Sequence, residues 1–233
     1  ILDNLSPVEL ESFSRCNRKF QHFVKIYKTS VFRIEKIYGT FFDPPEVIGE
    51  FQDLQGSTGL VVSGSTALGF FTRGHYAGDL DTYCQLLHSR VVGHWYQSHG
   101  YGYVPTDGQL DDLDADIDRV NAAIRADTPT IAVFEDTDIR EYKLHNIAAV
   151  WNFQHGPRQI QLVATKYSPL KTILSFHSTC VMNVVTHRAA YCLYPKLTLE
   201  SRATLLVDME IPLTEVQAYA VDKYVRRGFS VLH

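Results

Sequence analysis

One stretch of the chain, residues 59–85, constrains the fold more than any other. An apolar run over residues 60–63 leads directly into Gly64-Ser65, a short helix is predicted over residues 66–72, and Asp79-Leu80-Asp81 opens a second apolar run to residue 85. Alternation of strand, helix and strand predicts an α/β sheet with helices packed on it. Side chains alternate along a strand, so we expect Asp79 and Asp81 on one face and Leu80 in the core.

These residue types fit a site for phosphate and metal. Gly64 lets the backbone approach a phosphate closely, and Ser65 with the N-terminus of the next helix offers hydroxyl and N–H donors. Asp79 and Asp81 are placed to bind divalent cations, Mg²⁺ or Mn²⁺, which neutralise charge on phosphate oxygens. Arg73 is a candidate phosphate partner. The simpler interpretations are solvated carboxylates at a strand start, an ordinary strand-to-helix turn and a surface arginine.

The motif resembles the signature of the nucleotidyltransferase superfamily typified by DNA polymerase beta. Here Ser63-Gly64-Ser65 precedes Asp79-Leu80-Asp81-Thr82, with thirteen residues between Ser65 and Asp79. The runs 63–68, 70–73 and 176–183 are also similar to a group of uncharacterised fungal nucleotidyltransferase-fold proteins. The resemblance implies a small mixed sheet of α/β (α+β) class. It also implies transfer of a nucleoside monophosphate from an NTP to a hydroxyl, with Asp79 and Asp81 as catalytic metal ligands.

The resemblance implies a third carboxylate on a later strand, which would take the proton of the attacking hydroxyl and bind one metal ion. Gln161 occupies that position in the predicted strand 158–164, and an amide can do neither well. We assign Gln161, with Gly64, Ser65 and Arg73, to nucleotide binding. The alternative to an enzyme is a catalytically degenerate fold that binds a nucleotide or a protein. Residues that could replace the missing carboxylate are Glu135, Asp136, Asp138 and His177.

Residues 1–57 are predicted to form a helical segment packed on the main domain, residues 58–233. Ser6-Pro7-Val8-Glu9 is a capping-box start, and the spacing of Leu10, Phe13, Cys16 and Phe20 predicts one helix through residue 20. Further helices are predicted over residues 29–38 and 46–55. The opening Leu-Ser-Pro-x-Glu-Leu resembles an F-box start, which would imply a protein partner for these helices. Helices that simply pack on the sheet are the alternative.

The remaining segments predict further strands and helices around the sheet. The Asp-rich region 106–140 lacks the EF-hand pattern, and the apolar stripe that begins at Leu113 and Ile117 predicts a solvated acidic helix. Helices are also predicted over residues 89–99, 168–176 and 214–227. Strands are predicted over residues 142–153 and 159–164, and a hairpin over residues 180–194.

Composition limits the partners. A net charge of −4 and a pI near 6.2 argue against nonspecific binding of a long nucleic acid and favour a small charged ligand such as an NTP. No run approaches the roughly 18 apolar residues of a membrane span. The four cysteines form no CxxC pair and the start has no leader pattern, so we expect reduced thiols in an intracellular protein, cytoplasmic or nuclear.

Overall fold

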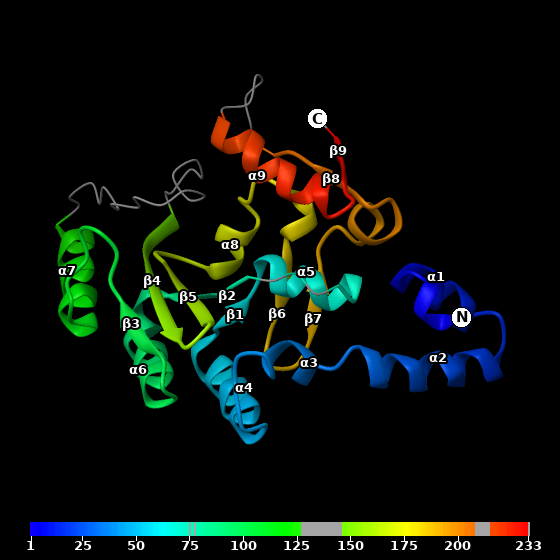
Figure 1. Cartoon of the computed structure of the whole chain (residues 1–233), viewed down its shortest axis with the longest axis horizontal. Helices are drawn as coiled ribbons and strands as arrows, with labels where there is room; N and C mark the ends of the chain where they lie inside the picture. Colours follow the sequence, from blue (N-terminus) through cyan, green and yellow to red (C-terminus); the bar gives the residue numbers. More distant parts are fainter. Residues whose placement is uncertain (75, 77, 127–145, 208–214, 233) are drawn as a thin grey trace.

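The computed structural model describes residues 1–74, 76, 78–126, 146–207 and 215–232, without the side chains of residues 215–217 and 220. It confirms the predicted mixed α/β class. A central sheet has helices on both sides (Figure 1). Within the described residues its strands follow the order β3 (Gly102–Val104), β4 (Ile147–His155), β5 (Arg158–Thr165), β2 (Leu80–Gln85), β1 (Val61–Val62), β6 (Asn183–Val185) and β7 (Ala190–Cys192).

The strands of this sheet are antiparallel to their neighbours except for β2 and β5, which run parallel. The predicted hairpin over residues 180–194 is confirmed as the antiparallel pair β6 and β7. A second, two-stranded sheet pairs β8 (Ala203–Leu205) with β9 (Ser230–Leu232). Short helical segments η2 (Leu86–His88), η4 (Thr179–Val181) and η5 (Lys196–Glu200) lie between these elements, and η1 (Leu2–Asn4) precedes the first helix.

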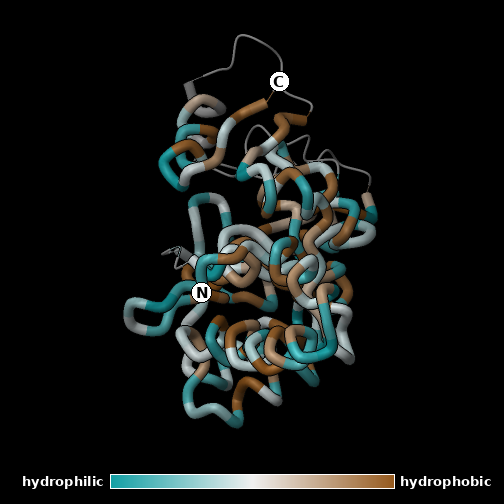
Figure 2. The backbone as a smooth tube through the Cα atoms, turned by 90° about the vertical axis from the view of Figure 1, so that its right-hand side faces the viewer, coloured by the Kyte–Doolittle hydropathy of each residue, from teal (hydrophilic) through white to brown (hydrophobic). Residues whose placement is uncertain are grey.

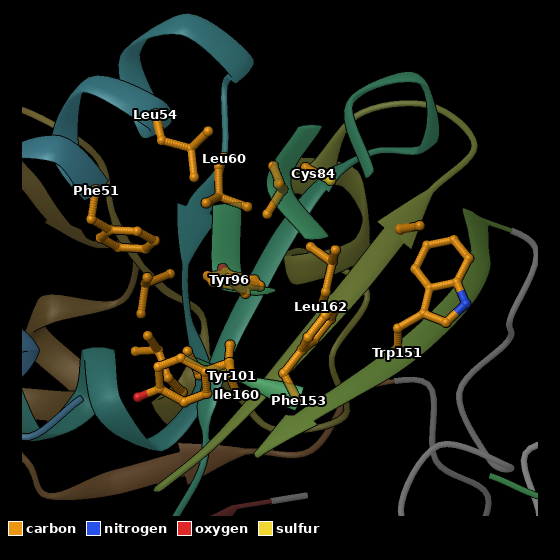
Figure 3. Close-up of a cluster of buried hydrophobic side chains, with 14 of the residues drawn as sticks. Phe51, Leu54, Leu60, Cys84, Tyr96, Tyr101, Trp151, Phe153, Ile160 and Leu162 are labelled. Carbon is orange, nitrogen blue, oxygen red and sulfur yellow. The ribbon is translucent and has the colours of Figure 1, made fainter. Parts of the chain in front are cut away.

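One face of the sheet packs against α4 (Glu46–Thr58), α6 (Ser89–Ser98) and α7 (Leu113–Arg125), around a large aromatic core (Figure 3). The other face packs against α5 (Gly64–Thr72), α8 (Pro169–Ile173) and α9 (Glu215–Arg226). Side chains alternate along β2, and this decides which of the two cores each one enters. Leu80 and Cys84 enter the first core, and Tyr83 enters the second. Asp81 therefore lies on the face covered by α5, α8 and α9.

The N-terminal helices differ from the prediction. The expected helix through residue 20 is two helices, α1 (Pro7–Ser14) and α2 (Arg18–Val31), because the Asn17 side chain accepts a hydrogen bond from the Phe20 amide and starts a new helix. The expected helix over residues 29–38 is also wrong. Phe32 leaves helical geometry at the end of α2, and α3 (Glu35–Tyr38) is a separate short helix.

Helix α4 is confirmed and belongs to the main core. Its residues Ile48, Phe51 and Leu54 are buried in the same cluster as the sheet. Helices α1 and α2 instead extend to one side of the sheet (Figure 1). Hydropathy changes repeatedly along the backbone and does not divide the chain into hydrophobic and hydrophilic parts (Figure 2). No helix within the described ranges is both long and apolar enough to cross a bilayer.

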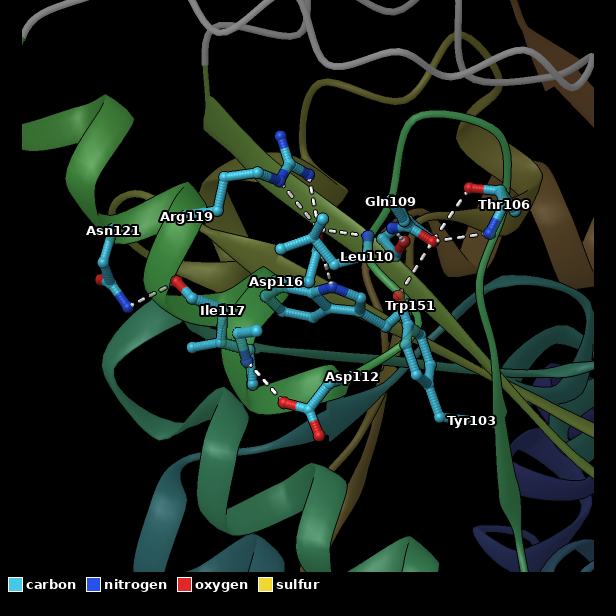
Figure 4. A network of polar contacts seen from close by, with 12 residues as sticks. Tyr103, Thr106, Gln109, Leu110, Asp112, Asp116, Ile117, Arg119, Asn121 and Trp151 are labelled. Atoms are coloured by element: carbon cyan, nitrogen blue, oxygen red, sulfur yellow. Dashed lines mark hydrogen bonds and ion pairs between the residues drawn. The ribbon is translucent and has the colours of Figure 1, made fainter.

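The acidic helix exists as α7, but its description as solvated is wrong at Asp116, which is fully buried. The Asp116 carboxylate accepts hydrogen bonds from Trp151 Nε1 at 2.8 Å, the Leu110 amide at 3.0 Å and the Arg119 guanidinium at 2.7 Å (Figure 4). A buried carboxylate is tolerated when such donors replace water. The sequence could not show this, because Trp151 lies on β4, outside the helix.

In the structure the four cysteines are free thiols. Cys84 and Cys180 are buried and Cys16 is exposed. Burial raises the pKa of the Cys84 thiol to about 12 and that of the Cys180 thiol to about 11. These two thiols are therefore neutral and unreactive near pH 7.

Candidate functional site

The site begins with a close contact between Gly64 and Asp81. Gly64 has a φ of 68°, a backbone conformation that favours glycine. A Cβ atom placed there would collide with the Asp81 carboxylate. The Ser63 amide donates to the Asp81 carbonyl at 3.1 Å, and Val62 pairs with Thr82, so the turn is tied to β2. Glycine is required here because of the positive φ and because there is no room for a Cβ atom. This lets α5 start directly beside the Asp81 carboxylate.

The three hydroxyl residues around Gly64 have different roles. Ser63 is buried and donates to the Asn183 carbonyl at 2.6 Å, so it joins the turn to β6. Thr66 donates to the Asp79 carbonyl at 3.2 Å and positions the residue before β2. The Ser65 hydroxyl lies against Gly78, where a Cβ would be 3.4 Å away. Ser63 is thus buried, whereas Ser65 and Thr66 are half-buried at the start of α5.

A row of polar residues crosses three neighbouring strands on the same face as Asp81. In the parallel pair β2 and β5, Asp81 lies opposite Gln161, and in the antiparallel pair β4 and β5, Gln161 lies opposite Asn152. All three are half-buried, and their neighbours along each strand are buried. Adjacent strands are about 4.8 Å apart, so these side chains are direct neighbours. Sequence reasoning missed Asn152, because only the register of β4 places it there.

Burial raises the pKa of the Asp79 carboxyl, and Lys223 of α9 acts in the opposite direction. Lys223 was also missed, because it comes from the closing helix, far along the chain. Asp79 is thus a partly desolvated carboxylate whose charged form is stabilised by the positive charge of Lys223. A bound divalent cation would offset the desolvation of the Asp79 charge.

The donor set fits one hard divalent cation. Mg²⁺ is bound by one or two carboxylates with further oxygen ligands, and Asp79, Asp81 and the amide oxygens of Gln161 and Asn152 are of that kind. In the part of the chain that the structure describes, no group of three or more His, Cys, Asp or Glu residues could hold a metal ion. Of the suggested replacements for the third carboxylate, His177 packs near Tyr224, with ring centroids 6.1 Å apart. The others, Glu135, Asp136 and Asp138, fall outside the described residues.

Arg73 is not brought to Asp81. It ends α5, the opposite end from Gly64, and a helix of nine residues is about 13 Å long. Its guanidinium donates to the carbonyls of Leu2 and Leu5 and to the Tyr27 hydroxyl at 2.8 Å. Arg73 therefore holds the N-terminal segment against α5, and a role in nucleotide binding stays a prediction.

Comparison with known proteins gives little similarity. No protein-family model matches the chain, and no curated protein sequence matches it. A solved structure described as "tRNA-processing enzyme (apo form I)" is similar, with a TM-score of 0.45 and 10% sequence identity. The similarity covers 81% of this chain and 49% of that chain, so this chain spans about half the length of that enzyme.

Proposed function

We propose that the chain binds a nucleoside triphosphate together with Mg²⁺ or Mn²⁺ at Gly64, Ser65, Asp79 and Asp81. The contact between Gly64 and the Asp81 carboxylate supports this proposal most directly. It places the N–H groups at the start of α5, which favour phosphate, beside a carboxylate, which repels it. A divalent cation between the two allows both to act on one ligand.

The proposed roles follow from the chemistry of each residue. Asp79 and Asp81 hold the cation, and an amide oxygen of Gln161 or Asn152 adds to them. Ser65 and the first N–H groups of α5 donate to phosphate oxygens. Lys223 lies close enough to act on the pKa of Asp79, so it adds positive charge for the triphosphate. When bound, the cation supplies neutralisation of phosphate charge.

Transfer of the nucleoside monophosphate to a hydroxyl is the second candidate function. The carboxylate pair Asp79 and Asp81 favours it, because charge neutralisation is the main requirement of phosphoryl chemistry. Gln161 opposite Asp81 argues against it, since a carboxamide cannot take the proton of the attacking hydroxyl. Binding without turnover is therefore the function that the geometry supports best.

Binding is tested by titration calorimetry of the full chain with each of the four common NTPs, with Mg²⁺, with Mn²⁺ and with EDTA. We expect cation-dependent binding that is lost in Asp79→Ala and in Asp81→Ala. Asp53→Ala is the matched control, because Asp53 is an exposed carboxylate on α4. Absence of binding for every NTP with both cations would contradict the proposal.

Turnover is tested separately with NTP labelled on the α-phosphate. We expect no label in any product above the Asp81→Ala background for the natural chain. Gln161→Asp restores a carboxylate opposite Asp81, so it is the variant in which turnover should first become measurable. Label transfer by the natural chain well above background would instead favour the enzyme.

A further inference from the structure

A cavity of about 520 Å³ lies between one side of α5 and its C-cap, the start of β5 with the turn before it, and residues 31–41. Of the described residues that line it, none is acidic and four are basic: Arg33, Lys36, Arg73 and Arg158. The whole chain has a net charge of −4. This concentration of positive charge in an acidic protein selects an anionic ligand.

The hydrogen bonds of these cations leave most of their charge uncompensated. Arg158 donates to the Phe41 carbonyl at 3.2 Å, and Arg73 donates to two carbonyls and a hydroxyl. Neither kind of partner has a formal charge. Arg33 pairs with Glu35 at 3.4 Å, but both side chains are half exposed, and such pairs contribute little. Much of their positive charge therefore stays available to an anionic ligand.

Aromatic and aliphatic side chains form another part of the wall. Phe41, Phe70 and Tyr76 line the cavity together with Val31 and Ile37. Its volume lies within the range of roughly 300 to 1,000 Å³ that is usual for small-molecule sites. Aromatic walls with basic groups suit a ligand that has a planar body and a phosphate group.

The cavity is adjacent to the candidate site. Ser65, Thr66 and Gly78 line it, and Thr66 is hydrogen-bonded to Asp79. We propose that this cavity binds a small phosphate monoester with a planar body, such as a nucleoside monophosphate, beside the site for the triphosphate. That the monophosphate lies beside a bound NTP rests on the proposed function. That it binds in the basic cavity does not.

The test is calorimetry of the full chain with AMP, adenosine and ribose 5-phosphate, all in EDTA. We expect AMP to bind, and adenosine and ribose 5-phosphate to bind at least about 10-fold more weakly, since each lacks one half of the recognised chemistry. The double variant Arg33→Glu/Lys36→Glu should weaken AMP binding by about 10-fold to 100-fold. Its matched control is Lys19→Glu/Lys25→Glu, which reverses two exposed charges on α2 outside the cavity and should leave AMP affinity unchanged.

Absence of AMP binding would overturn the proposal, and so would AMP binding that both double variants leave unchanged. Equal affinity for AMP and ribose 5-phosphate would overturn the role of the aromatic wall. Asp81→Ala separates the two proposals, because it should abolish cation-dependent NTP binding and leave AMP binding intact. If the natural chain shows only one of the two kinds of binding, cation-dependent NTP binding or AMP binding in EDTA, the missing one identifies the proposal that has failed.

Discussion

At the scale of single residues, Gly64 and Asp81 form the most constrained pair of the site. Gly64 combines a positive φ with a position against the Asp81 carboxylate, and the Ser63 amide holds the Asp81 carbonyl. Any side chain at position 64 must therefore both adopt a strained backbone and displace the carboxylate. The site and the turn depend on the same glycine.

We expect Gly64→Ala to lower the free energy of unfolding by about 1–3 kcal/mol, from the left-handed backbone and the displaced carboxylate. Urea denaturation measures this change, and NTP titration should show weaker binding. Gly49→Ala is the control, because Gly49 lies inside α4 with open space around its Cβ position. That substitution should stabilise the chain by about 0.5–1 kcal/mol. Equal effects of the two substitutions would contradict the geometry of the turn.

The Asp79 carboxyl should make the stability of the folded chain depend on pH. Burial raises its pKa in the folded chain. Between the ordinary Asp pKa and this raised value, the folded chain binds more protons than the unfolded chain, so Asp79 makes stability fall as pH rises. Asp79→Asn removes this effect. We expect the variant to be more stable than the natural chain above the raised pKa, with the difference shrinking to zero below the ordinary Asp range.

Denaturation of both proteins over a pH series measures this difference. Lys223→Ala is the companion variant, because Lys223 lowers the pKa of Asp79. Removing the lysine should raise the pKa of Asp79 further, so the fall in stability should extend to higher pH. A variant Asp79→Asn that is less stable than the natural chain at neutral pH would show that the Asp79 charge is not desolvated.

At the scale of one element, α7 is attached to the sheet by a buried carboxylate as well as by its apolar stripe. Asp116 accepts from Trp151 on β4 and from the Leu110 amide before the helix. Leu113, Ile117 and Val120 pack in the same core. The polar contacts fix which turn of the helix faces β4, since hydrogen bonds are directional and apolar contacts are not.

We expect Asp116→Ala to lower the free energy of unfolding by about 2–6 kcal/mol, because the Trp151 and Leu110 donors lose their acceptor at about 1–3 kcal/mol each, while the half-exposed Arg119 guanidinium can turn to water. The control is Asp118→Ala on the same helix, whose exposed pair with Arg90 is worth about 0.5 kcal/mol or less. Chemical denaturation compares the two. The fluorescence of Trp151 should also change in Asp116→Ala. If both variants lose the same free energy of unfolding, the buried network is contradicted.

At the scale of the whole molecule, the N-terminal helices α1 and α2 are joined to the main fold partly through Arg73. Its guanidinium reaches Leu2, Leu5 and Tyr27, and Tyr27 donates in turn to Asp3. Helix α4 instead contributes to the central core. Residues 1–31 therefore lie outside the central core that α4 shares, and binding of a protein partner through these helices stays a prediction.

Arg73→Ala should increase amide hydrogen exchange in residues 1–31 and leave exchange in the sheet unchanged, because the lost bonds join only these parts. We expect NTP affinity to change by less than about threefold, under 1 kcal/mol. Arg15→Ala is the control, an exposed arginine that pairs with Glu11 inside the same segment. A large loss of NTP affinity with unchanged exchange would instead support Arg73 as a nucleotide ligand.

The sequence by itself determined the local features of this protein. Strand period, the turn at Gly64-Ser65, the spacing to Asp79-Leu80-Asp81 and the start of α1 at Ser6 depend on interactions between residues close along the chain. It also predicted one strand that ends at residue 153 and another that starts at residue 159, on the two sides of the turn between β4 and β5. Asn17 was the local signal that was overlooked, since a helix cap at that position divides α1 from α2.

Only the tertiary structure decided which distant residues meet. The register of β4 and β5 places Asn152 and Gln161 beside Asp81, α9 brings Lys223 to Asp79, and α7 buries Asp116 against Trp151. It also turned Arg73 toward the N-terminus and formed the basic cavity from segments far apart in the chain. Such contacts follow from how apolar faces pack together, and a short-range pattern contains no information about that choice.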